Sequence, residues 1–100
     1  MHEYWVYMVR CCDGSYYVGV TSDVERRLAE HRSGDLSEGS YVYKRLPFEL
    51  VYVQSFQYIL DAIAWEKRVK RWTRAKKEAL IRGDQDALEN LSRRRGGRPK

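Results

Sequence analysis

The sequence predicts an α/β (α+β) fold, a small, mainly antiparallel three-stranded sheet flanked by helices in the order ββαβααα. Runs rich in aromatic and β-branched residues stand early in the chain and once near its middle, whereas the later segments have helical spacing and capping residues. The chain has 100 residues. We expect a single domain over residues 1–91 and a basic, disordered tail over residues 92–100.

Two strands are expected at the start of the chain. The run YWVYMVR at residues 4–10 and the run YYVGVT at residues 16–21 are both rich in β-branched and aromatic residues. Between them, Asp13-Gly14 is typical of a tight hairpin turn. The two strands should therefore pair in antiparallel fashion.

A helix should follow the hairpin. Ser22 and, three residues later, Glu25 match a capping box, and Gly34 is a typical helix end. Residues 35–47 mix charges with glycine, serine and Pro47. This composition favours a surface loop near the ligand.

The rest of the chain is expected to hold one strand and three helices. The run FELVYVQSF at residues 48–56 alternates only loosely, as a largely buried central strand would. A helix from about Tyr58 to Trp72 carries one wide apolar face, and Glu66 falls inside it, where an unpaired carboxylate is costly. The residues expected to cap or close the last two helices are Thr73, Gly83 and Asp84.

Basic charge is concentrated in two places. The net charge is +5, but the tail carries five of the 19 basic residues, which leaves 14 against 14 acidic ones. Residues 66–82 hold eight basic and two acidic side chains. Both features suit a polyanion, or are simply a solvated helix face and a disordered tail, and charge alone does not decide. The residues assigned to nucleic-acid binding are Lys67, Lys70, Arg71, Arg74, Lys76 and Lys77.

Other classes of protein are disfavoured. Cys11 and Cys12 are adjacent, which is poor geometry for a disulfide and too few ligands for a zinc site, so we expect free thiols. No apolar run approaches the length of a membrane span, and the first residues lack the pattern of a signal peptide. We expect a cytoplasmic protein, a monomer or weak dimer, with no membrane partner and no small-molecule cofactor.

Five chemically useful residues stand at spacings that carry more information together than singly. They lie in WVY at 5–7, YVG at 17–19, DVERRLAEH at 23–31 and AIAWEKRVKRW at 62–72. Singly, each has an ordinary explanation, because tyrosines pack, an inward histidine is commonly structural, and Glu66 could pair with Lys70. Together, they resemble the GIY-YIG nuclease family. The similarity is closest to its small stand-alone bacterial members, related to the endonuclease domain of the nucleotide-excision-repair incision subunit.

The resemblance implies a GIY-YIG-like fold and a divalent-metal-dependent phosphodiesterase. The positions that match the family's motif residues are Tyr7, Tyr17, Arg27, His31 and Glu66, the last as the ligand of one Mg²⁺ or Mn²⁺ ion. A guanidinium and a hard cation would stabilise the negative charge that builds on the phosphate oxygens. One tyrosine, helped by the histidine, is implied as general base, and the sequence leaves open which. All five groups should share one solvent-reachable hollow.

The register of the hairpin constrains this interpretation. With a two-residue loop, Tyr7 and Tyr17 would point to opposite faces of the sheet. We therefore predict a bulge or an odd-length loop around residues 12–15. The chain departs from the family pattern at Trp5, which replaces a glycine and could narrow or cover the site. It also has Glu78 about where many members carry an asparagine.

Two functions from different classes stay open. The favoured one is a Mg²⁺-dependent DNA endonuclease that selects DNA structure or damage, as in DNA repair, with low sequence specificity. The alternative is a nucleic-acid-binding module of GIY-YIG fold that cleaves weakly or not at all and recruits a partner nuclease.

Overall fold

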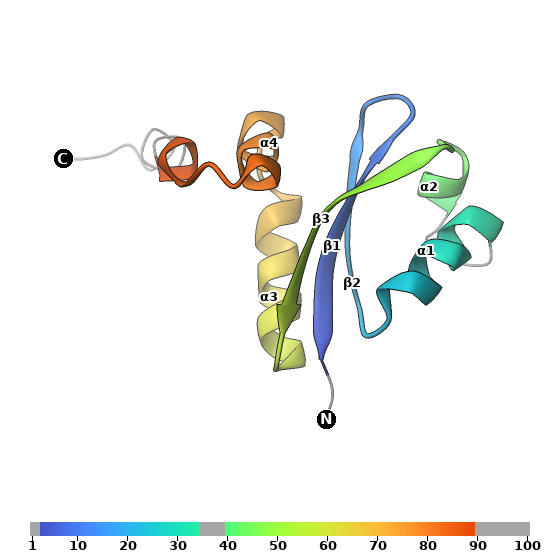
Figure 1. Ribbon diagram of the computed structural model, residues 1–100, viewed down its shortest axis with the longest axis horizontal. Helices are drawn as coiled ribbons and strands as arrows, with labels where there is room; N and C mark the ends of the chain where they lie inside the picture. The colour runs from blue at the N-terminus through green and yellow to red at the C-terminus, as the bar shows by residue number, and fades with distance from the viewer. Residues whose placement is uncertain (1–2, 35–39, 90–100) are drawn as a thin grey trace. The chain divides into compact units, whose positions relative to one another are not determined.

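The computed structural model describes residues 3–34 and 40–89, in which three strands and four helices follow one another (Figure 1). Their bounds are β1 Tyr4–Cys11, β2 Tyr16–Thr21, α1 Val24–Ser33, α2 Ser40–Tyr43, β3 Phe48–Phe56, α3 Ile59–Lys70 and α4 Arg74–Arg82. Residues 85–89 are helical as well. The predicted fold class is confirmed, and α2 is an unpredicted helix within the expected loop.

The chain divides into two compact units. One ends at Lys70 and holds the sheet with α1, α2 and α3, and the other begins at Arg71 and holds α4. The single domain over residues 1–91 stays a prediction, and the predicted tail at 92–100 lies outside the described residues. Among the residues that the structure describes, no helix is both long enough and apolar enough to cross a membrane.

The sheet has the strand order β2-β1-β3, and both pairs are antiparallel. The central strand is β1, whose residues from Val6 to Val9 are fully buried. β3 lies at an edge and much of it is exposed, so the prediction of a central strand at 48–56 is wrong. The near-continuous apolar run of β1 is the pattern that burial on both faces requires.

The β1–β2 hairpin has a three-residue loop. The N–H of Cys11 donates to the carbonyl of Ser15 at 2.8 Å, and the N–H of Gly14 donates to the carbonyl of Cys11 at 2.9 Å. Gly14 adopts a left-handed φ of 86°, which this loop type requires at its third position. The predicted odd-length loop is thereby confirmed.

This register places both motif tyrosines on one face of the sheet. Tyr7 pairs with Gly19, and Val9 pairs with Tyr17, so Tyr7 and Tyr17 have the same parity. We call this surface the tyrosine face. Leu28 of α1 belongs to the same buried cluster, as does Val42 of α2, which shows that these two helices cover it.

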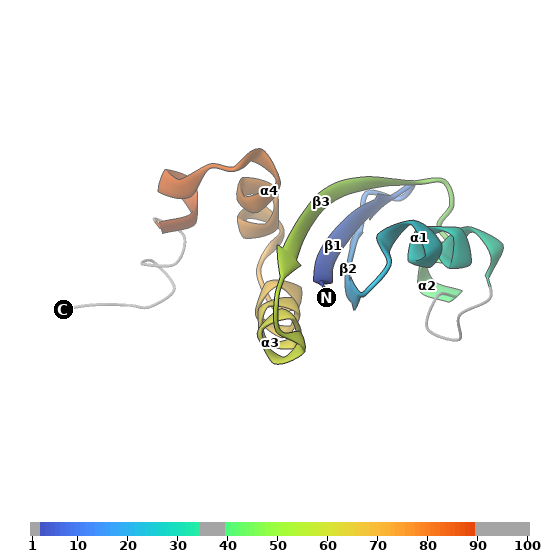
Figure 2. The same ribbon diagram turned by 60° about the horizontal axis from the view of Figure 1, so that its bottom comes forward.

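The opposite face of the sheet is covered by α3. This face carries Val6, Met8 and Val18, all of them buried, and α3 contacts each of the three strands. The indole N–H of Trp65 donates to the hydroxyl of Tyr52 at 3.1 Å, which ties α3 to β3. Figures 1 and 2 show α3 on one side of the sheet and α1 with α2 on the other.

The start of α1 differs from the predicted capping box at Ser22 and Glu25. Asp23 is the N-cap, and its carboxylate accepts the N–H of Arg26 at 3.1 Å. The hydroxyl of Thr21 accepts the N–H of Asp23 at 3.1 Å, which fixes the extended cap conformation one residue later than predicted. The predicted capping residues that the structure confirms are Gly34, Thr73, Gly83 and Asp84.

Candidate active site

The centre of the candidate site is a hydrogen bond between Tyr7 and His31. The Tyr7 hydroxyl lies 2.7 Å from Nε2 of His31, and both side chains are 0% exposed. β1 supplies the tyrosine from the middle of the sheet, and the last turn of α1 supplies the histidine. The pair therefore fixes α1 against the tyrosine face.

Gly19 lies directly beneath the ring of Tyr7. A Cβ atom at Gly19 would lie 2.6 Å from the hydroxyl oxygen of Tyr7 and 2.7 Å from its Cζ atom. The backbone of Gly19 is not left-handed, so the close approach of the ring, and not the conformation, requires glycine here. The glycine of the YVG motif thus makes room for the ring of Tyr7, the tyrosine of the first motif.

Tyr17 lies beside this pair and is only partly buried. Its ring centroid lies 5.2 Å from that of His31, nearly edge-on, and 6.3 Å from that of Tyr7. On its other side, the ring of Tyr41 from α2 lies 6.0 Å away. Because β2 is an edge strand, Tyr17 is the motif tyrosine with access to solvent.

Tyr41 is held in place by an ion pair that the sequence did not reveal. The guanidinium of Arg45 lies 3.8 Å from the centre of the Tyr41 ring, and its Nε lies 3.1 Å from a carboxylate oxygen of Asp13. Hydrogen bonds from Ser15, and then from Arg45, lower the pKa of Asp13. The hairpin loop is therefore bound to the segment after α2, although the two lie far apart in sequence.

Arg27 lies one turn before His31 on α1. Its Nε is 3.4 Å from a carboxylate oxygen of Glu30, and its side chain is about one quarter exposed, at 27%. At 100° per residue, Arg27 lies 200° from Glu25 around the helix. Because Glu25 lines a hollow together with Leu50 of β3, Arg27 lies on the side of α1 that is turned away from that hollow.

Glu66 lies on the side of the sheet that α3 covers. It is 9% exposed, on the same buried helix face as Ala62 and Val69, as predicted. Its carboxylate lies 3.1 Å from the ammonium of Lys70. The structure therefore does not bring Glu66 into the predicted common hollow on the tyrosine face, because the apolar stripe of α3 packs against the opposite face.

The residues present fit a weakly held metal ion and not a tightly held one. Within residues 3–34 and 40–89, no three His, Cys, Asp or Glu side chains could hold a metal together. Glu66 is a single carboxylate donor, and Lys70 is bound to one of its oxygens. Mg²⁺ commonly takes one or two carboxylates and completes its shell with waters and substrate phosphate. Such an ion fits here if it arrives with a phosphate and displaces Lys70.

The basic residues assigned to nucleic-acid binding differ in their exposure and in their partners. Lys67 and Arg71 are exposed. Lys76 is 8% exposed, with its ammonium 4.2 Å from the centre of the Trp72 ring, so it packs and does not present the exposed charge that was predicted. Burial lowers the pKa of Lys77. The two that form ion pairs with a glutamate one turn away are Lys70 and Arg74.

Comparison with known proteins decides the family. The GIY-YIG catalytic domain family matches residues 3–79, most of the chain. The chain belongs to the GIY-YIG family. The domain that defines this family is a nuclease domain.

Small relatives share nearly their whole length with this GIY-YIG chain. A UPF0213 protein of Halobacterium salinarum is 45% identical over 81 residues, which are 81% of this chain and 100% of the relative. A UPF0213 protein of Streptococcus pneumoniae is 41% identical over 85 residues, 85% of this chain and 84% of the relative. The chain is thus similar to stand-alone GIY-YIG proteins, as the sequence predicts.

Two solution NMR structures agree with the GIY-YIG fold described above. The UPF0213 protein from Bacillus halodurans is 39% identical and matches with a TM-score of 0.54, over 90% of this chain and 94% of that one. A protein from E. faecalis is 32% identical and matches with a TM-score of 0.58, over 83% of this chain and 90% of that one.

Proposed function

We propose that this GIY-YIG protein is a metal-dependent endonuclease that hydrolyses phosphodiester bonds in DNA, selecting DNA structure or damage with little regard to sequence. The observation that carries the proposal is the contact cluster of Tyr7, His31 and Tyr17 on the tyrosine face. Three residues that match the family's motifs meet there, although they come from three different elements. A fold retained only for binding would not require a glycine at position 19, where the absence of a side chain makes room for the ring of Tyr7.

The geometry favours Tyr17 over Tyr7 as the group that takes the proton from the attacking water. Tyr7 is fully buried, and its hydroxyl is engaged by His31. Tyr17 lies on the edge strand with partial exposure, and it packs against the same histidine. Tyr7 is therefore proposed to position His31, and His31 to position Tyr17.

The remaining charges would meet the substrate around the β2 edge. Arg27 belongs to α1, which packs on the tyrosine face, and α3 contacts β2 from the opposite face. Arg27 would exchange Glu30 for a phosphate bound at the edge, and Glu66 would hold a Mg²⁺ or Mn²⁺ ion in place of Lys70. When bound, the ion supplies positive charge next to the phosphate oxygens, which stabilises the charge that develops there.

Exposed basic residues would hold the nucleic-acid backbone. Lys67 lies on α3 next to Glu66 and is exposed, and Arg71, in the second unit, is exposed as well. Lysine and arginine contacts to phosphate carry no sequence information. This agrees with a nuclease of low sequence specificity.

The proposal is tested by incubating the protein with supercoiled, nicked, flap and single-stranded DNA, and with RNA, in Mg²⁺ or EDTA. We expect cleavage of DNA in Mg²⁺ alone, its loss in Glu66→Gln, and a loss of at least about 100-fold in Tyr17→Phe. Glu78→Gln is the matched control, because Glu78 forms a 3.1 Å ion pair with Arg74 one turn away, as Glu66 does with Lys70. Cleavage that survives in Glu66→Gln would contradict the assignment.

The alternative function has one observation in its favour. Glu66 forms an ion pair with Lys70 and lies across the sheet from the tyrosines, which would suit a binding module that recruits a partner nuclease. The same experiment separates the two functions. DNA binding that survives in EDTA, with no product for any substrate in Mg²⁺ or Mn²⁺, selects the binding module.

A further inference from the structure

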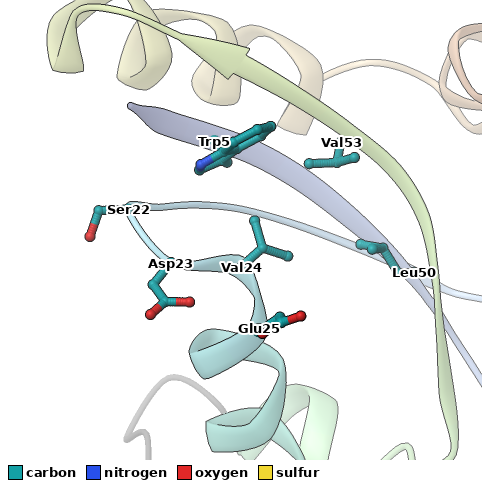
Figure 3. Close-up of a pocket in the computed structure, with 7 residues that line it drawn as sticks. All are labelled: Trp5, Ser22, Asp23, Val24, Glu25, Leu50 and Val53. Atoms are coloured by element: carbon teal, nitrogen blue, oxygen red, sulfur yellow. The ribbon is translucent and has the colours of Figure 1, made fainter. Parts of the chain in front are cut away.

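A hollow of about 350 Å³ opens on the tyrosine face beside the start of α1 (Figure 3). Its apolar wall consists of Trp5 from β1, Leu50 and Val53 from β3, and Val24 from α1. In Figure 3 the side chain of Val24 points toward the indole of Trp5. The hollow is thus bounded on one side by the flat face of a large aromatic ring.

Part of this wall is left open to solvent. Leu50 is 39% exposed and Val53 is 44% exposed, although both stand on the tyrosine face, which α1 and α2 cover elsewhere. Val53 pairs with Tyr7 across the β1–β3 ladder, and Trp5 lies on the same strand as Tyr7, so the hollow adjoins the Tyr7–His31 pair. Neighbouring exposed apolar side chains on a rigid sheet are typical of a ligand site.

The rim of the hollow is acidic. Asp23 and Glu25 lie at its edge, across from Trp5 in Figure 3, and one carboxylate oxygen of Asp23 already accepts the N–H of Arg26. Two carboxylates repel a phosphate, so the nucleic-acid backbone should stay outside. They accept hydrogen bonds, so they favour a group that presents N–H donors. The fitting ligand therefore has a flat apolar face and an amino edge.

We propose that the hollow binds an unpaired nucleobase with an exocyclic amino group, stacked on Trp5 with the amino group toward Asp23 and Glu25. The base belongs to the DNA of the proposed nuclease, so this inference rests on the proposed function. A base inside a duplex stack exposes neither face, whereas a bulged or displaced base exposes both. Trp5, which replaces the motif glycine, then becomes the residue that selects distorted DNA.

The test measures DNA binding by fluorescence anisotropy in EDTA, where no cleavage can occur. The probes are duplexes with one unpaired cytosine, one unpaired thymine or one unpaired abasic residue, and a fully paired duplex. We expect the cytosine bulge to bind about tenfold more tightly than the abasic bulge, the equivalent of about 1.4 kcal/mol. Thymine should bind less tightly than cytosine, because two carbonyl groups flank its single N–H.

Variants distinguish the contribution of the Trp5 ring to base binding from that of the acidic rim. Trp5→Leu should abolish the preference for a base over an abasic residue, and Trp5→Phe should keep part of it. The control is Tyr58→Leu, which removes a well-exposed aromatic side chain outside the hollow and should leave the preference for a base over an abasic residue unchanged. Glu25→Gln should reduce the preference of cytosine over thymine, with stacking unaffected.

Three results would overturn the proposal. The first is equal affinity for the base and abasic bulges, and the second is an unchanged preference in Trp5→Leu. The third is a dimer in sedimentation velocity that Val53→Asp dissociates, because a second copy would then cover the hollow. The proposed function fails separately, since the cleavage assay can be negative while the base preference persists, or positive while the preference is absent.

Discussion

Replacing Gly19 by alanine tests the packing on which the candidate site depends. The new Cβ atom would lie between 2.6 and 2.8 Å from three atoms of the Tyr7 side chain. Tyr7 cannot withdraw easily, because it is fully buried and its hydroxyl is bonded to His31. Either the sheet shifts or the Tyr7–His31 hydrogen bond breaks.

The sign of the effect follows from three magnitudes. Overpacking a rigid core costs about 1–3 kcal/mol, and losing a hydrogen bond costs about 0.5–1.5 kcal/mol. A glycine-to-alanine change at a site without left-handed backbone returns about 0.4–1 kcal/mol through the unfolded state. We therefore expect Gly19→Ala to lower the free energy of unfolding by about 2 kcal/mol, which is a large share of the total stability of a small domain.

A double-mutant cycle assigns this cost to the Tyr7 ring. In a Tyr7→Leu background, the atoms that meet the new Cβ are gone, so Gly19→Ala should cost at least about 1 kcal/mol less, as measured by urea unfolding. Gly83→Ala is the control, because a Cβ atom added at Gly83 would meet no other atom within 4 Å and only the left-handed φ of 71° resists the change. Its cost should be the same in both backgrounds. An equal cost of Gly19→Ala in both backgrounds would refute the reasoning.

Three further predictions concern charge and reactivity. Hydrogen bonds from Ser15, and then from Arg45, lower the pKa of Asp13, so its charged form stabilises the hairpin above the ordinary pKa of about 4, and this stabilisation is lost as the pH falls through the lowered pKa. Asp13→Asn should therefore be less stable than the wild type at pH 7, and the difference in the free energy of unfolding should shrink as the pH is lowered. Cys12 is exposed, whereas burial raises the pKa of Cys11. A thiol reagent should therefore label Cys12 before Cys11, and mass spectrometry over time shows which residue carries the label. Lys67→Ala and Arg71→Ala should each reduce the salt slope of DNA binding by about one unit, with no change in base preference.

The sequence predicts the hairpin well because its signals are local. The Asp13-Gly14 turn and the parity argument about Tyr7 and Tyr17 need only residues close to one another in the chain. The odd-length loop follows from requiring the two tyrosines to share a face, and Gly14 supplies the left-handed residue. Strand order is different, because it depends on whether residues 48–56 pair with β1 or with β2, and nothing in those residues indicates which of the two.

The contacts of the candidate site are harder to predict than its residues. The Arg45–Asp13 ion pair joins two segments whose charges look like ordinary surface charges in the sequence. Helical periodicity places Glu66 on a buried face correctly, but periodicity does not say which side of the sheet that face meets. Lys76 looks like part of a basic run, and only the fold reveals its packing on Trp72.

Two ion pairs suggest how a substrate would engage Arg27 and Glu66, which lie on opposite sides of the sheet. Arg27 is paired with Glu30 and Lys70 with Glu66, each within one helical turn. The Arg27–Glu30 pair is partly exposed, and such pairs contribute about 0.3–0.5 kcal/mol, far less than a guanidinium gains from a phosphate. Under the proposed function, a substrate phosphate would replace Glu30 as the partner of Arg27, and Glu66 would hold the ion in place of Lys70. Because β2 is an edge strand, a phosphate bound beside it would be open to both faces of the sheet, which a site built on the central strand would not allow.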